Sequence, residues 1–199
     1  PDKSEEVILH RGDHVFPFNF SLPPNLPSSF ERNHGYVRYS IKVKVKRTGL
    51  HSDYTLEKPF TVLHAMDLNL DPEAFRPAQM QESKMICCLC CATGPVTAVF
   101  RIDRKGYVPG ETILLNAEIQ NQSNRRIYNT EVKLRMFIKF FAGHEGRHTR
   151  TEYATVTKVE YGAIEPGDSG TWSNDGLVIP PVPPSYLEGC SLIDIRYQV

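Results

Sequence analysis

Residues 102–111 have the sequence Ile102-Asp103-Arg104-Lys105-Gly106-Tyr107-Val108-Pro109-Gly110-Glu111 and separate two runs, 96–102 and 113–119. In both runs every second residue is apolar, which is the period of a half-buried strand. Gly106 and the pair Pro109-Gly110 supply the backbone freedom and the fixed φ angle that a tight connection between strands requires. The stretch therefore predicts a hairpin of a β-sandwich, a fold that binds partners more often than it catalyses.

The same alternation recurs along the chain and predicts an all-β fold without a helix. It is clearest in residues 37–45, where apolar side chains alternate with basic or polar ones. Fifteen prolines and thirteen glycines interrupt the chain at short intervals, as many turns require. The expected strands are 14–20, 37–45, 58–67, 84–91, 95–103, 111–121, 130–141, 150–161, 170–179 and 190–199.

Residues 71–80 lose the alternation and contain Pro72 and Pro77, so they predict a boundary between two domains. The sequence begins with Pro1, and its last residue, Val199, lies inside an alternating run. A domain rarely ends in the middle of a strand, because unpaired backbone groups would then remain at a sheet edge. We therefore expect a fragment that lacks strands at both ends.

Composition and the absence of sequence motifs argue against several classes of function, among them nucleic acid binding and enzymatic catalysis. The 23 basic and 23 acidic residues give a formal net charge of zero, so charge provides no argument for a nucleic acid partner. The sequence contains no P-loop, dinucleotide-binding fingerprint or nucleophile elbow, and its carboxylates are scattered singly. It has no apolar run long enough to cross a bilayer. We therefore expect a binding protein that is not an enzyme and uses no metal or cofactor.

Four of the five cysteines, Cys87, Cys88, Cys90 and Cys91, lie together, and Cys190 stands apart. The four are too close to link distant parts of a fold, and the odd total argues for a reducing, cytosolic compartment. On an extended strand their side chains alternate between two faces, so one zinc ion cannot collect all four. Burial as apolar strand residues is expected, while lipidation, redox sensitivity and zinc binding remain alternatives.

The basic side chains of the strand at 37–45 form the first candidate binding surface. They are Arg38, Lys42, Lys44 and Lys46, followed by Arg47. Such a surface suits the phosphate groups of a phosphorylated tail or of an anionic lipid. Alternate lysines on an edge strand also prevent edge-to-edge aggregation, and this purely protective role is the alternative.

Pro183, Pro184 and Tyr186 form the second candidate. The sequence Pro183-Pro184-Ser185-Tyr186 matches the P-P-x-Y pattern that WW modules bind in a polyproline II conformation. The motif leads directly into the expected strand at 190–199, so an ordered connection between strands is the alternative interpretation.

Several stretches together resemble one family. In the first part of the chain they are Gly12-Asp13-His14-Val15-Phe16-Pro17-Phe18, Leu22-Pro23-Pro24-Asn25-Leu26-Pro27-Ser28-Ser29-Phe30-Glu31 and His34-Gly35-Tyr36-Val37-Arg38-Tyr39. In the second part they are residues 102–111, Trp172, Ile179-Pro180-Pro181-Val182 and Cys190-Ser191-Leu192-Ile193. In this order they resemble the alpha-arrestins, the arrestin domain-containing proteins.

The resemblance implies two immunoglobulin-like, arrestin-type β-sandwiches, both incomplete. Residues 1–70 would be the C-terminal half of the N-domain, 71–80 a short hinge, and 81–199 a C-domain without its last strands. The implied function is that of a cytosolic adaptor, recruited to the plasma membrane and endosomes. It would recognise the cytosolic tails of membrane receptors or transporters and recruit HECT-type ubiquitin ligases for endocytosis and endosomal sorting, with anionic lipid as a further partner.

Two departures limit what the resemblance implies. The ligase-binding motifs of the family lie in a tail after the C-domain, whereas Pro183–Tyr186 falls where relatives have ordered domain sequence. One subgroup binds thioredoxin through a C-domain cysteine, and this chain has none between Cys91 and Cys190. A retromer-like or coat-type sorting scaffold that does not act through ubiquitin ligases is the alternative function.

Overall fold

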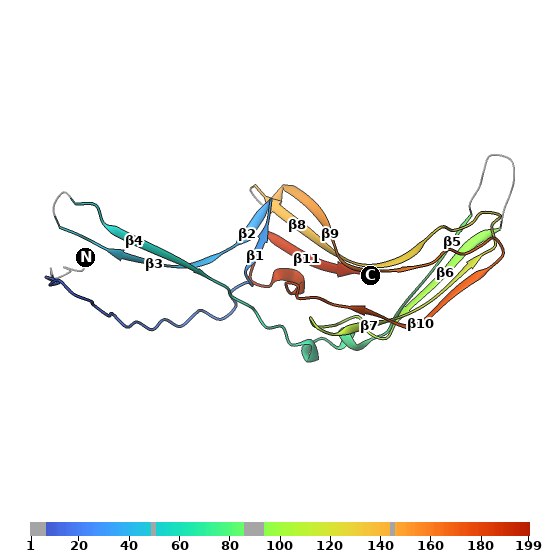
Figure 1. The fold of residues 1–199 in the computed structure, drawn as a ribbon, viewed down its shortest axis with the longest axis horizontal. Helices are drawn as coiled ribbons and strands as arrows, with labels where there is room; N and C mark the ends of the chain where they lie inside the picture. Colours follow the sequence, from blue (N-terminus) through green and yellow to red (C-terminus); the bar gives the residue numbers. More distant parts are fainter. Residues whose placement is uncertain (1–6, 49–50, 86–93, 144–145) are drawn as a thin grey trace.

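The computed structural model describes residues 7–48, 51–85, 94–143 and 146–199, and it confirms the all-β fold (Figure 1). The described residues contain no α-helix, and their 3-10 turns include η1 (Leu68–Leu70), η2 (Pro72–Phe75) and η4 (Ser185–Leu187). The strands are β1 (Phe30–Arg32), β2 (Gly35–Val37), β3 (Tyr39–Val45), β4 (Tyr54–Phe60), β5 (Ala78–Met85), β6 (Pro95–Ile102), β7 (Thr112–Asn121), β8 (Thr130–Ala142), β9 (His148–Tyr161), β10 (Ser169–Val178) and β11 (Ile193–Gln198).

Strands β5 to β11 form two sheets, in the orders β10-β7-β6-β5 and β11-β8-β9. All neighbouring strands are antiparallel. The alternation in β8 places Leu134, Met136 and Ile138 in the core, where each is at most 4% exposed. Leu115 and Leu177 of the other sheet are fully buried. Apolar burial on the facing sides of the two sheets therefore holds this sandwich together.

The connection between β6 and β7 is held by its own side chains. Glu111 accepts hydrogen bonds from the backbone N–H of Val108 at 2.8 Å and from the guanidinium of Arg104 at 2.9 Å. That guanidinium also lies 4.6 Å from the ring centre of Tyr107. The short connection expected at 102–111 is therefore present, and charged as well as turn-forming residues stabilise it.

Turn η2 lies against this connection. The carbonyl of Ala74 accepts hydrogen bonds from the backbone N–H groups of Lys105, at 3.0 Å, and Gly106, at 2.7 Å. Glu73 forms ion pairs with Arg76 at 2.6 Å and with Lys105 at 3.4 Å. The expected hinge at 71–80 thus includes a turn that is attached to the second sandwich.

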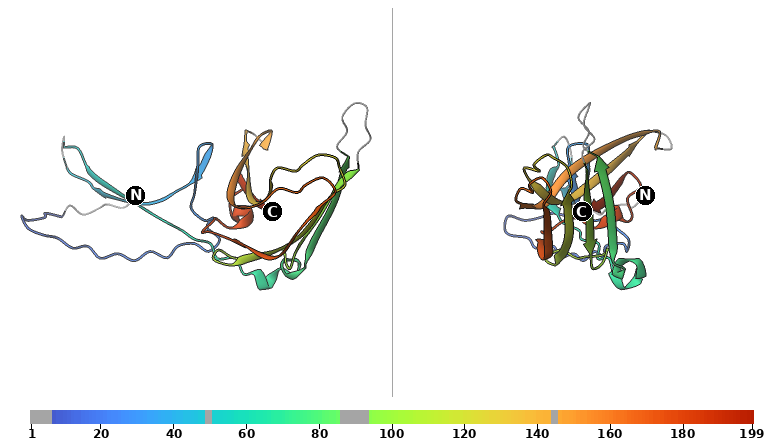
Figure 2. Two further views of the ribbon diagram at one scale, coloured as in Figure 1. Left: turned by 45° about the vertical axis from the view of Figure 1, so that its right-hand side comes forward. Right: turned by 90° about the vertical axis from the view of Figure 1, so that its right-hand side faces the viewer.

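The N-terminal part forms two separate hairpins, β1–β2 and β3–β4. The β1–β2 hairpin lies against the sheet β11-β8-β9, where Phe30 joins a core cluster with Phe140, Leu187 and Ile193. The β3–β4 hairpin extends away from the second sandwich (Figures 1 and 2). Hydrophobic contact through Phe30 therefore ties the β1–β2 hairpin to the second sandwich.

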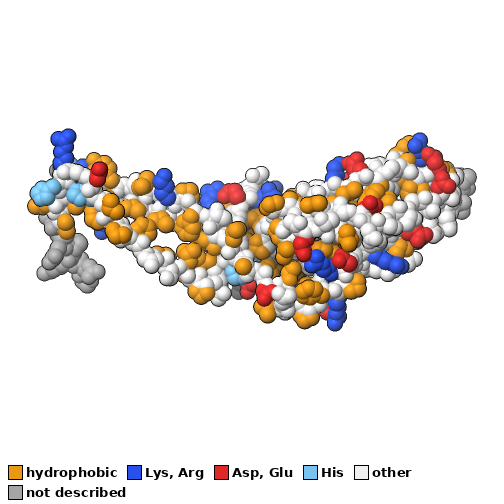
Figure 3. All heavy atoms as spheres, turned by 60° about the horizontal axis from the view of Figure 1, so that its bottom comes forward, with side chains coloured by type: hydrophobic (Ala, Val, Ile, Leu, Met, Phe, Trp, Pro, Cys, Tyr) orange, Lys and Arg blue, Asp and Glu red, His pale blue; other side chains and the backbone are white. Residues whose placement is uncertain are grey.

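Both faces of the β3–β4 hairpin are exposed. Its apolar face contains Ile41, Val43 and Leu56, which are 43% to 57% exposed. Figure 3 shows apolar side chains at the surface of this part of the molecule. The alternation in 37–45 correctly indicates a strand with one apolar face, but no described residue covers that face.

Several expected strands differ from the observed ones, and the strand expected at 37–45 is interrupted at Arg38. Residues 14–20 form no strand, because Pro17 lacks an N–H group and Phe16, Phe18 and Phe20 are 69% to 74% exposed, without a partner strand in the described chain. The strand expected at 58–67 is β4, which begins and ends earlier because it pairs with β3, Val45 facing Tyr54 and Tyr39 facing Phe60.

The strand expected at 84–91 overlaps β5 only at residues 84 and 85. The observed strand begins earlier, at Ala78, and pairs with β6. Pairing with β6 therefore extends β5 into the segment 71–80, for which the sequence predicts no strand. The remainder of the expected strand, from residue 86 onwards, lies outside the described residues.

Candidate binding surface

The lysines of β3 lie on one face of the β3–β4 hairpin, as the alternation predicts. Register places Lys42 opposite Glu57 and Lys44 opposite Thr55. Lys44 forms an ion pair with Asp53 at 2.8 Å, and this pairing lowers the pKa of the Asp53 carboxyl. The two lysines of β3 therefore share their face with two carboxylates, and Lys46 follows directly after the strand. The face is less basic than β3 alone suggests, because the acids come from the partner strand and the turn.

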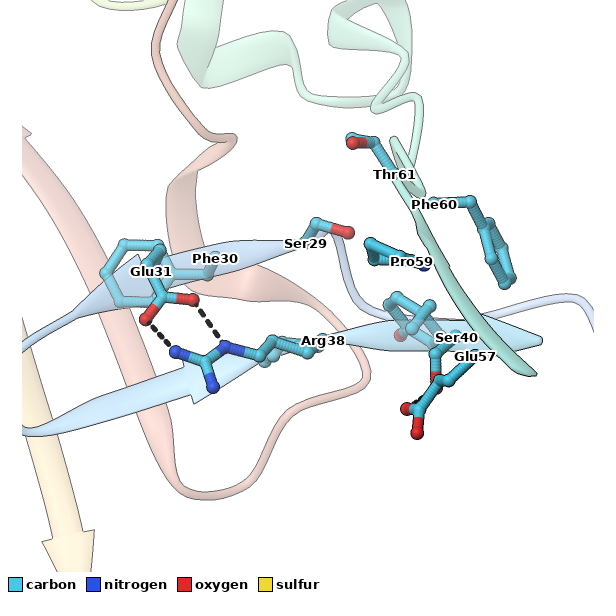
Figure 4. A pocket seen from close by; sticks show the side chains of 11 residues that line it. Ser29, Phe30, Glu31, Arg38, Ser40, Glu57, Pro59, Phe60 and Thr61 are labelled. Carbon is cyan, nitrogen blue, oxygen red and sulfur yellow. Dashed lines mark hydrogen bonds and ion pairs between the residues drawn. The ribbon is translucent and has the colours of Figure 1, made fainter. Parts of the chain in front are cut away.

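Arg38 is not part of that face. It lies between β2 and β3, where the strand is interrupted, and its guanidinium binds Glu31 through Nε at 2.7 Å and Nη2 at 2.6 Å (Figure 4). This two-point hydrogen bond raises the pKa of Arg38 and lowers the pKa of Glu31, so both groups stay ionised and paired. The structure therefore separates Arg38 from the lysines with which the sequence groups it.

A pocket of about 350 Å³ lies beside this ion pair (Figure 4). Its lining includes Tyr39 and Phe60, whose ring centres are 5.9 Å apart, and Glu57, which accepts a hydrogen bond from Ser40 at 2.6 Å. The pocket joins the end of the β3–β4 hairpin to the β1–β2 hairpin. Aromatic surface next to charged groups suits contact with a peptide side chain.

Pro183, Pro184 and Tyr186 lie in an ordered connection between β10 and β11. The carbonyl of Pro183 accepts a hydrogen bond at 2.7 Å from Tyr197, and burial raises the pKa of that tyrosine. Pro184 has φ −64° and ψ 153°, which is the polyproline II region. Tyr186 has a positive φ of 66° and is 59% exposed, whereas the next residue, Leu187, is fully buried. The aromatic ring is thus accessible, although the backbone around it is anchored.

The cysteines at 87–91 lie outside the described residues, so their expected burial and the zinc alternative stay predictions. Cys190 is a free, half-buried thiol. Within the described ranges no three His, Cys, Asp or Glu side chains are grouped so that they could hold a metal ion. The described part of the chain also has no helix that is long and apolar enough to cross a membrane.

Contacts between the two parts of the chain could not be found from the sequence. The imidazole Nδ1 of His34 contacts the carboxylate of Glu152, and its ring centre lies 6.1 Å from that of Phe140. The imidazole Nε2 of His64 lies 3.4 Å from Glu188. These residues are more than a hundred positions apart in each pair, and no local pattern marks such distant partners.

Comparison with known proteins matches both parts of the chain to one family. Residues 1–69 match the family model of the arrestin (or S-antigen) N-terminal domain, and residues 92–199 match that of the C-terminal domain. Arrestin domain-containing protein 17 of Caenorhabditis elegans is 35% identical over 99% of this chain and 46% of its own length.

Two human proteins show the same pattern. Arrestin domain-containing protein 4 is 32% identical over 97% of this chain and 45% of its own length. Arrestin domain-containing protein 1 is 28% identical over 98% of this chain and 44% of its own length. The chain spans about half the length of the curated relatives it matches.

Proposed function

Because the chain belongs to the arrestin domain-containing family, the alpha-arrestins, we propose that it acts as a cytosolic adaptor for membrane-protein cargo. The observation that carries this proposal is the match of both arrestin domains, in order, along the chain. The architecture supports it, since paired sheets offer faces and loops for docking. The cargo would be the cytosolic tails of receptors or transporters, and recruitment would take the protein to the plasma membrane and endosomes.

The lysine face of β3 is the proposed contact for acidic or phosphorylated tails and for anionic lipid headgroups. Lys42 and Lys46 form no ion pair within the described residues, so their charges are available to a partner. Arg38 is already bound to Glu31 and would contribute through the adjacent pocket.

The second part of the proposal is recruitment of HECT-type ubiquitin ligases for endocytosis and sorting. Within this chain Pro183, Pro184 and Tyr186 are the residues that a WW module would contact. Titration of the folded chain with an isolated WW module tests this, with Tyr186→Ala as the matched variant. If the WW module binds the parent chain but not the Tyr186→Ala variant, the result supports Pro183–Tyr186 as the ligase-binding motif. If the module does not bind the parent chain, ligase recruitment does not use this motif.

A cross-linking pull-down from a membrane-containing lysate, with the chain as bait, tests the function as a whole. We expect membrane receptors or transporters together with HECT-type ligases. Recovery of a fixed set of coat or retromer-like subunits without membrane cargo would instead support a sorting scaffold.

A further inference from the structure

The sheet β11-β8-β9 has an outer face that carries both cations and aromatic rings. The inner side chains of this sheet are covered by the facing sheet and by the β1–β2 hairpin. On the outer face, register aligns three successive rows of residues across the strands. The rows are Asp194–Lys139–Thr151, Arg196–Phe137–Tyr153 and Gln198–Arg135–Thr155. We call Arg135, Phe137, Lys139, Tyr153 and Arg196 the cation–aromatic face.

The aromatic side chains stand at the centre of this face. The rings of Phe137 and Tyr153 meet edge to face at 4.9 Å, and Tyr153 is 65% exposed. The guanidinium of Arg135 lies 5.5 Å from the ring centre of Phe137. A hollow of about 280 Å³ next to these rings is lined by Phe137, Lys139, Thr151, Asp194 and Arg196. The face therefore combines apolar surface, positive charge and space for a side chain.

The charge of the cation–aromatic face is only partly neutralised. Arg196 donates through Nε to Asp194 at 2.9 Å, and its side chain is 68% exposed. Neither Arg135 nor Lys139 forms an ion pair within the described ranges, 7–48, 51–85, 94–143 and 146–199. Three cations thus face a single carboxylate, which leaves an excess of positive charge for a partner.

The spacing of the cations matches an extended chain. Lys139, Arg196 and Arg135 belong to successive rows, and each row is two residues, or about 6.8 Å, from the next. Alternate side chains of an extended peptide repeat at the same interval, so acidic residues at every second position would meet all three cations. Between them, the peptide would cross the rings of Phe137 and Tyr153.

We propose that the cation–aromatic face binds an acidic segment of a partner protein in an extended conformation. This goes beyond the adaptor function and does not depend on it, because the face lies on a different sheet from the β3 lysines. A membrane surface fits less well. A central pair of rings separates its three cations, so this face lacks the continuous basic cluster that holds anionic lipids.

The same outer face offers a matched control. Further along β8 and β9, Lys133 contacts Glu131 and Lys158 contacts Glu160, so these lysines are already paired; their side chains are 35% and 50% exposed. The pairing raises the pKa of Lys158 and lowers that of Glu160. Their loss should leave the cation–aromatic face unchanged.

Fluorescence anisotropy with a short labelled peptide of alternating Glu and Thr tests the proposal. We expect salt-sensitive binding that weakens by about tenfold or more in the triple variant Arg135→Gln, Lys139→Gln, Arg196→Gln. The double variant Arg135→Gln, Lys139→Gln keeps the Arg196–Asp194 pair and should show most of this loss while its circular dichroism stays native. The variant Lys133→Gln, Lys158→Gln should bind like the parent chain.

Several outcomes would overturn the proposal. One is absence of peptide binding, and another is equal binding of a Gln-Thr peptide, which would remove the role of charge. An equal loss of peptide binding in the Lys133→Gln, Lys158→Gln variant would show that the peptide responds to overall positive charge and not to this face. Binding of phosphatidylserine vesicles without binding of the peptide would assign the face to lipid.

Discussion

A Cβ atom at Gly106 would lie 2.5 Å from the Cβ of Ala74, closer than two non-bonded carbon atoms approach each other. This contact joins η2, which follows the N-terminal hairpins, to the β6–β7 connection of the second sandwich. Glycine is thus required at position 106 by the neighbouring segment, whereas its backbone does not adopt a positive φ angle. Ala74 is 5% exposed, so it has little room to move away.

The first prediction concerns this contact. Gly106→Ala should lower the free energy of unfolding by about 1–3 kcal/mol, because it overpacks the junction and weakens the two hydrogen bonds to the Ala74 carbonyl. Chemical denaturation measures the change. Gly162→Ala is the control, since a Cβ there meets no atom within 4 Å. Equal effects of both substitutions would contradict the contact.

Phe30 should be the main anchor of the β1–β2 hairpin. It is 6% exposed and lies in the core cluster with Ile138 and Phe140, so Phe30→Ala should cost about 3 kcal/mol or more. Limited proteolysis should then cut the chain between residues 28 and 38 sooner. Phe20→Ala removes a ring that is 74% exposed and should change neither measurement. Unchanged proteolysis of the Phe30 variant would refute the anchoring role.

Asn121 should be essential for the turn that follows β7. Its buried amide donates to the carbonyls of Arg125, at 2.7 Å, and Glu165, at 3.1 Å, and accepts from the Ser123 hydroxyl at 2.6 Å. Asn121→Ala removes these buried hydrogen bonds and should cost about 2–4 kcal/mol in thermal or chemical unfolding. Asn124→Ala removes the same amide from an exposed position and should have almost no effect.

Glu111 should make stability depend on pH. Hydrogen bonds from Val108 N–H and Arg104 lower its pKa below the ordinary value of 4.5, so the folded state favours the carboxylate. Its contribution is complete above the unfolded pKa and is lost as pH falls through the lower, folded pKa. It should be about 1 kcal/mol or less, because the side chain is partly exposed.

Denaturation curves at several pH values check this contribution. The difference in unfolding free energy between the parent chain and Glu111→Gln should shrink as pH falls below 4.5. If the difference in unfolding free energy stays constant with pH, the charge of Glu111 does not contribute to stability.

The proposed cargo contact also has an internal control. Replacing Lys42, Lys44 and Lys46 by Glu should abolish binding of an acidic tail without unfolding the chain, since all three are exposed. Lys58→Glu changes charge on the opposite face of the same hairpin, next to Ile41 in register, and should leave binding intact. Co-precipitation with a phosphorylated receptor tail measures both, and unchanged binding of the triple variant would count against this surface.

The strands of the second sandwich were predictable because each has a clear period of its own. In β8 the alternation places every second residue from Val132 to Phe140 in the core. The N-terminal part was less predictable. Residues 14–20 are as aromatic as a strand, yet a strand needs a hydrogen-bonded neighbour, and none of the described residues provides one.

The candidate sites show the same division. The lysines of β3 share a face, as alternation predicts, but the sequence of β3 contains no information about Asp53 and Glu57, which lie beside them. Arg38 does not lie on the lysine face, because the strand is interrupted there and because Glu31, seven residues earlier, binds its guanidinium. Pairing between side chains depends on the neighbouring strand, which no local period specifies.

The amino-acid sequence by itself determined that this protein is built from strands, where most of them lie and which family it belongs to. These properties depend on residues that are near one another in the chain. Folding alone created the docking of Phe30 on the second sandwich, the Ala74–Gly106 contact and the alignment of Arg135, Lys139 and Arg196. They arise from the register and packing of distant segments, and these are set by the three-dimensional balance of burial and hydrogen bonding.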